Sequence, residues 1–187
     1  MTKIREALLA APPERRVSAI RSLSDEALAL LAAELDGSGD EWSPFRADPV
    51  AFVTQALHED VWSKQVEILE SLRDNKRTAV PACHAPGKSH IAARAVAWWV
   101  ATHMNDDVRV VTTATTFRQV KGILWPHIRS VASRHGLPGE VFTTEWKIDG
   151  RIVADGFSPA EHNEAAVQGI HAENLLIVVD EAGGGEV

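Results

Sequence analysis

The chain has 187 residues, a formal net charge of −7 and one cysteine, Cys83. This length suits one domain with a small appendage, the hydrophobic fraction of 45% excludes global disorder, and the lone cysteine excludes an internal disulfide. The charge excludes a strongly basic nucleic-acid-binding protein, and no apolar run is long enough to cross a membrane. The eight histidines lack zinc-ligand spacing, and the first residues lack the apolar core of a secretory signal.

Residues 1–36 are expected to be helical. Leu28, Leu31 and Leu35 recur at helical spacing, and Ser24 precedes them as a candidate N-cap. The segment fits ordinary packing or an appendage better than a partner-binding coiled coil, because it is too short for sustained heptads. Gly, Ser and Asp dominate the stretch that follows, so residues 37–47 are predicted as a linker before a domain at 48–187.

A second helical region is predicted from about Pro49 to Leu72, with a break near His58–Val61. The side chains expected to face the core are Phe52, Ala56, Val66 and Leu69.

The hydrophobic period then alternates between strand and helix. Strands are predicted at 77–82, 107–114 and 174–182, helices at 89–104 and 116–136, and a hairpin at 141–157 with its turn at Asp149-Gly150. The second helix contains Pro126 and closes at Gly136. This alternation predicts an α/β fold with a mostly parallel sheet covered by helices on both faces.

The octapeptide from Ala82 to Ser89 resembles a phosphate-binding loop, G-x-x-x-x-G-K-[ST], with alanine in place of the first glycine. Gly87 lets the backbone approach phosphate, Lys88 brings a positive charge to the β and γ phosphates, and the Ser89 hydroxyl suits Mg²⁺. The remaining loop residues expected around the nucleotide are Cys83, His84, Ala85 and Pro86. The alternative is a helix start that contains Gly-Lys-Ser without binding anything.

Two acids end the apolar run LLIVV about ninety residues later. At the carboxyl end of a parallel strand, Asp180 can hold Mg²⁺ and Glu181 can polarise the attacking water. The alternative is a strand that ends in solvated acids. Together the loop and the acids predict an ATP site. They favour the P-loop NTPases of the additional-strand, RecA-like class, in which 107–114 is the extra strand.

Four stretches together resemble the ATPase domain of the large terminase subunit of tailed phages. They are DPVAFVTQALHEDVWSKQVEILESLRDNKRTAV, ACHAPGKS, VVTTATTFRQVKGILWPHI and VQGIHAENLLIVVDEA. Their order and spacing carry the resemblance, which covers about Asp48 to Ala182. The first stretch has the aromatic-x-x-Gln element that touches adenine in this family, here Trp62 and Gln65.

The resemblance implies an ATP- and Mg²⁺-dependent motor that packages double-stranded DNA. Its implied partners are the portal, the small terminase subunit and sibling large subunits, in the cytoplasm of a bacterial host that carries a phage or prophage. Lys88 and Glu181 would be catalytic, and Ser89 and Asp180 would hold Mg²⁺. His84 stands where some members have an arginine, so a neighbouring subunit would supply one. The surface candidates are Arg94, Arg118, Arg129 and Arg134.

The chain departs from the family at its end, because the coupling motif and the nuclease domain of the family do not follow DEAGGGEV. We therefore expect an ATPase domain that is incomplete at its C-terminus and monomeric in isolation. Two alternatives stay open: a non-catalytic fragment that binds nucleotide or partner subunits, and a helicase-like ATPase domain. A DNA-binding regulator has little support, because only 116–136 offers a basic helical face.

Overall fold

The computed structural model describes residues 24, 41–81, 87–158 and 171–180. The chain divides into two units, Met1–Glu41 and Trp42–Val187, and the description below concerns the second. The predicted N-terminal helical segment lies outside the described residues, apart from Ser24.

The second unit begins at Trp42, within the stretch that we predicted as a linker. The Trp42 ring packs edge-on against Phe52 with 5.7 Å between centroids, and Phe45 contacts the same ring at 6.3 Å. The Trp98 indole N–H also donates a hydrogen bond of 3.0 Å to the Phe45 carbonyl oxygen. The described end of the predicted linker is therefore packed against the core, because its aromatic residues outweigh the glycine-rich composition before them.

The predicted helical region is present and broken where expected. It consists of η1 (Ser43–Phe45), α4 (Pro49–Ala51), the π-helical turn η2 (Phe52–Ala56) and α5 (Ser63–Asp74). Asp48 caps α4 by accepting a 2.9 Å hydrogen bond from the Ala51 N–H. Phe52 and Leu69 are fully buried as predicted, whereas Ala56 and Val66 are partly buried.

The structure contains a five-stranded sheet with the order β2-β3-β4-β1-β5, which confirms the α/β class. The sheet is mixed and not mostly parallel as we predicted, because the hairpin strands add two antiparallel pairings. Its strands are β1 (Val108–Ala114), β2 (Glu140–Val141), β3 (Glu145–Ile148), β4 (Arg151–Phe157) and β5 (Asn174–Asp180). β1 lies parallel to both β4 and β5, and β3 pairs antiparallel with β2 and β4. The predicted hairpin is present, and its turn residues Asp149 and Gly150 have φ of 51° and 76°.

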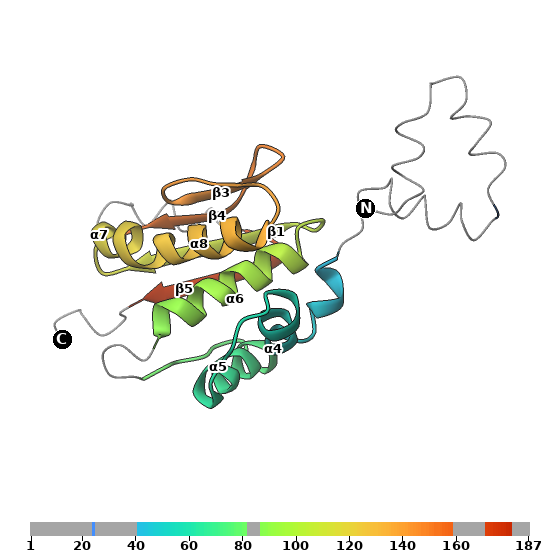
Figure 1. Ribbon diagram of the computed structural model, residues 1–187. Coiled ribbons are helices and arrows are strands. Elements are labelled where there is room, and N and C mark those ends of the chain that lie inside the picture. Colours follow the sequence, from blue (N-terminus) through green and yellow to red (C-terminus); the bar gives the residue numbers. More distant parts are fainter. Residues whose placement is uncertain (1–23, 25–40, 82–86, 159–170, 181–187) are drawn as a thin grey trace, which may run out of the picture. The chain divides into compact units, whose positions relative to one another are not determined.

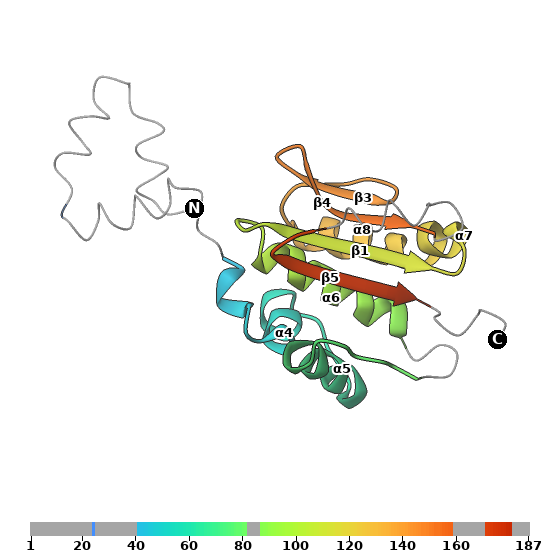
Figure 2. The same cartoon turned by 180° about the vertical axis from the view of Figure 1, so that it is seen from behind.

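The described helices that pack on the sheet lie on one face of it. They are α6 (Lys88–Thr102), α7 (Phe117–Gln119), the π-helical turn η3 (Val120–Leu124) and α8 (Trp125–His135). Figure 1 shows α6 and α8 in front of the strands, and Figure 2, from behind, shows the strands in front of these helices. Our expectation of helices on both faces is therefore wrong for the described part of the chain.

Because the described helices cover only one face of the sheet, alternate side chains along β5 differ in their exposure to solvent. Leu176 and Val178 pack against the helix-covered core, whereas Ile177 and Val179 are 56% and 55% exposed. An apolar run typical of a strand buried on both faces thus has one open face among the described residues.

The strand predicted at 77–82 is also wrong where the structure describes it. Residues 77–81 form neither helix nor strand, and Val80 is 39% exposed. Lys76 and Arg77 precede only two apolar residues, and Pro81 has no N–H to give to a strand partner. A segment this short buries too little apolar surface to hold it in the sheet.

The core between sheet and helices is closely packed around Gly156 of β4. The buried Trp125 indole N–H donates to the Thr112 hydroxyl at 2.9 Å above this glycine. A Cβ atom placed on Gly156 would lie under 3.0 Å from atoms of Trp125, Val120 and Thr112. Only glycine leaves room for this packing.

Candidate functional site

The start of α6 is the first component of the candidate site. Gly87 is its N-cap and adopts φ 82° in the left-handed region, which glycine enters without steric cost. Lys88 and Ser89 form the first helical turn, whose backbone N–H groups are not used within the helix. The loop positions Ala82, Cys83, His84, Ala85 and Pro86 lie outside the described residues.

The end of β5 is the second component, and it meets the first. The Ser89 hydroxyl lies 3.4 Å from a carboxylate oxygen of Asp180, although the two residues are 91 positions apart. The carboxyl end of β5 and the start of α6 lie at the same edge of the sheet (Figure 1). The structure therefore brings together two residues that we predicted as Mg²⁺ ligands. Glu181 lies outside the described residues.

The donor types at this place suit a hard cation. A hydroxyl and a carboxylate supply the oxygen ligands that Mg²⁺ prefers, and Mg²⁺ commonly uses few protein ligands together with water and phosphate. Across 41–81, 87–158 and 171–180 no three His, Cys, Asp or Glu side chains gather as a metal site of their own. The Ser89–Asp180 pair would hold Mg²⁺ as part of a phosphate complex.

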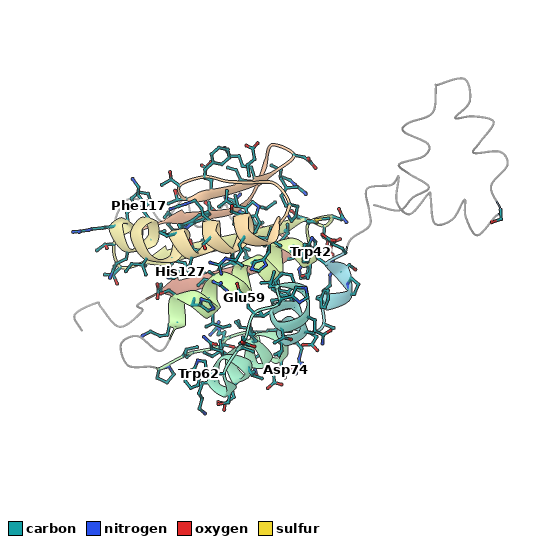
Figure 3. All side chains as sticks on the ribbon, viewed as in Figure 1. Trp42, Glu59, Trp62, Asp74, Phe117 and His127 are labelled. Carbon is teal, nitrogen blue, oxygen red and sulfur yellow. The ribbon has the colours of Figure 1, made fainter. Side chains whose placement is uncertain are left out.

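Gln65 and Trp62 form the third component. Gln65 is buried on α5, and its side-chain oxygen accepts a 3.3 Å hydrogen bond from the Trp62 N–H. Its amide nitrogen packs on Gly87, where an added Cβ would approach it to 3.0 Å. The Trp62 side chain points outward, with 51% exposed (Figure 3). The predicted aromatic-x-x-Gln element thus borders the start of α6.

A charged cluster around Glu59 lies farther along α6. Arg94 donates to both carboxylate oxygens of Glu59, through Nε at 2.7 Å and Nη2 at 2.8 Å. His135 of α8 lies 3.0 Å from the same carboxylate. Burial alone would raise the pKa of Glu59, but the hydrogen bonds and charges of Arg94 and His135 outweigh it and lower the pKa to about 2. Glu59 is therefore ionised at neutral pH.

His90 follows Ser89 in α6, and its imidazole lies 3.7 Å from the Glu59 carboxylate. Burial lowers the pKa of His90, and the positive charge of Arg94 lowers it further. The imidazole beside the candidate site is consequently neutral at pH 7.

The arginines that we predicted as surface candidates fall into different environments. Arg94 is wrong in this role, because its side chain is 3% exposed and bound to Glu59. Arg129 donates to the Thr143 carbonyl oxygen at 2.6 Å, and Arg134 lies 3.6 Å from Glu59. Arg118 is exposed on α7.

Sequence reasoning missed Glu59 and His135. Neither belongs to a motif, and they lie 76 positions apart. The sequence offers one indication of this cluster, the position of Glu59 in the predicted helix break. If the chain reverses there and packs on the core, the carboxylate is partly buried and requires a positively charged partner.

Comparisons with known protein families, with curated proteins and with solved structures found no match to this chain. Among the described residues, no helix combines the length and the apolar character needed to cross a membrane.

Proposed function

We propose that this chain is an ATP-binding and ATP-hydrolysing P-loop domain of the kind that drives DNA packaging in the large terminase subunits of tailed phages. The approach of Ser89 to Asp180 beside the start of α6 carries the proposal. It joins the end of a phosphate-loop pattern to the end of an acidic strand, two features that a chance Gly-Lys-Ser match has no reason to bring together.

Each residue has a defined role in this proposal. Lys88 and the N–H groups of the first turn of α6 bind the β and γ phosphates. Ser89 and Asp180 hold Mg²⁺, which would neutralise charge on those phosphates when bound. Glu181 accepts a proton from the attacking water, and the Trp62–Gln65 element contacts the base.

One observation favours the non-catalytic alternative. Residues 77–81, which lead into the loop, lie outside the sheet, so among the described residues no strand anchors the loop from that side. A phosphate loop that no sheet strand precedes suits nucleotide binding better than the fixed geometry that hydrolysis requires. Phosphate release therefore separates the proposal from its alternative.

Titration of the purified chain with ATP, with and without Mg²⁺, tests the proposal together with a phosphate-release assay. Asp180→Asn is expected to weaken Mg²⁺-dependent ATP binding at least about tenfold, because a charged contact contributes about 1.5–3 kcal/mol. Asp74→Asn is the matched control, since Asp74 pairs with Arg73 on the surface of α5.

The possible results distinguish the hypotheses. The ATPase is supported if the wild type binds ATP and releases phosphate, and Glu181→Ala binds ATP but releases none. A wild type that binds without turnover supports the non-catalytic module. A wild type that binds no ATP rules out the ATPase and the nucleotide-binding module, and leaves the fragment that binds only partner subunits.

Trp62 gives an optical test of the base-binding element. Of the six tryptophans, Trp62 is the one with a largely exposed side chain, whereas Trp125 and Trp146 are fully buried. ATP with Mg²⁺ is expected to reduce acrylamide quenching of the intrinsic fluorescence by covering the Trp62 ring. Trp62→Phe should lose this protection and Trp99→Phe should keep it. Protection that survives in Trp62→Phe would place the base elsewhere.

A further inference from the structure

The segment from Glu59 to Gln65 contacts α6 at two separate points. Gln65 packs on Gly87 at the helix start, and Glu59 binds Arg94 farther along the same helix. Trp62 lies between these two contacts in the sequence. The segment is therefore fixed to α6 on both sides of the tryptophan.

The backbone just before Glu59 has an unusual conformation that determines where Glu59 lies. The π-helical turn η2 ends at Ala56, two residues before His58, which adopts φ 52°, an uncommon value for a residue other than glycine. The Glu59 N–H then donates 3.0 Å to the Val53 carbonyl oxygen. A costly backbone conformation of this kind persists only where surrounding contacts determine it.

The Glu59–Arg94 ion pair fixes the position of Glu59 relative to α6. Both side chains are largely buried, with 13% and 3% exposed, and the two parallel hydrogen bonds fix distance and orientation together. Arg94 also donates to the His90 carbonyl oxygen at 3.4 Å, which ties the pair to the first turns of α6. Figure 3 labels Glu59 beside this helix.

We propose that Glu59 is a positioning residue for nucleotide binding. Its ion pair with Arg94 holds the Trp62–Gln65 segment at a set distance from the first turn of α6, so that base and phosphates bind together. This inference rests on the proposed function. It assigns to Glu59 an effect on base recognition and none on phosphate binding, which Lys88 and the helix start provide.

Comparison of ATP with inorganic tripolyphosphate isolates this effect, because tripolyphosphate carries the phosphates without a base. The wild type is expected to bind ATP more tightly than tripolyphosphate. Glu59→Gln and Arg94→Lys are each expected to lose about tenfold in ATP affinity, the equivalent of about 1.4 kcal/mol, with tripolyphosphate affinity unchanged. Arg94→Lys keeps the charge but removes the paired hydrogen bonds, so it reports on geometry even if Glu59→Gln does not fold.

Asp106→Asn is the matched control. Asp106 pairs with Arg46, which also donates to the Thr102 carbonyl oxygen at the other end of α6. Both affinities should stay at the wild-type value in this variant. Thermal unfolding and near-ultraviolet circular dichroism establish that each variant is folded.

Affinities for ATP and for tripolyphosphate that both stay at the wild-type value in folded Glu59→Gln and Arg94→Lys would overturn the inference and leave the proposed function standing. Equal losses for both ligands would also overturn it, because they indicate a general structural role. A wild type that binds neither ligand would overturn the inference and the proposed function together.

Discussion

Lys88→Ala is expected to lower the affinity for ATP in the presence of Mg²⁺ by about 100-fold. The lysine is the first residue of α6, directly after the left-handed Gly87, and its partly buried side chain belongs to the edge where Ser89 meets Asp180. Loss of one member of a desolvated charge pair costs about 2–5 kcal/mol, and 2.7 kcal/mol corresponds to about 100-fold. Isothermal titration calorimetry at fixed salt measures the change.

Lys121→Ala is the control for this substitution. Lys121 is an exposed residue of η3, so it removes the same charge from a different surface. ATP affinity close to wild type is expected for Lys121→Ala. Equal losses in the two variants would show that ATP responds to overall charge and not to a site at the start of α6.

Gly156→Ala is expected to destabilise the fold by about 3 kcal/mol. The new methyl group would meet Trp125, Val120 and Thr112, all of which are buried, at distances that side chains do not tolerate. The indole hydrogen bond to Thr112 would have to move as well. In a domain of this size such a loss lowers the Tm by about 10 °C, which differential scanning calorimetry detects.

Gly122→Ala provides the comparison, because a Cβ atom at Gly122 meets nothing within 4 Å. Alanine is also a better helix former than glycine by about 1 kcal/mol, so Gly122→Ala should match or exceed the wild-type stability. A Gly156→Ala variant as stable as Gly122→Ala would show that η3 moves away from the sheet at little cost.

The parts of the fold that the sequence predicts well are those with local signals. The turn at Asp149-Gly150, the Gly136 helix end and the break at His58–Val61 follow from backbone preferences of a few residues, and all three are present. β1 and β5 likewise coincide with β-branched apolar runs.

The failed predictions depend on partners that a local pattern does not contain. Residues 77–81 lie outside the sheet because a strand needs a neighbour and enough apolar surface, and Val80 alone supplies little. β5 resembles a doubly covered strand, yet Ile177 and Val179 face outward. Trp42 joins the core through Phe52, a contact invisible in the composition of 37–47.

The candidate site divides in the same way. Ser89 and Asp180 could be paired from the sequence, since a loop pattern and an acidic strand end imply a common edge of the sheet. Glu59, Arg94 and His135 could not, because three separate elements contribute one residue each. The burial of Arg94 in particular contradicts what its charge suggests.

The π-helical turn η3 bears on how the length of this chain can vary. An i→i+5 hydrogen bond encloses one residue more than the α-helical bond, so a π turn stores an extra residue without rotating the helix on either side. Loss of one residue at the start of α8, before Ile128, would turn every later side chain by about 100° and take Ile128 and Val131 out of the core. Loss of Gly122 would instead convert η3 to an ordinary α turn with the same faces buried. Deletions fixed during evolution should therefore concentrate at this turn, where insertion and removal leave the packing of the helix in register.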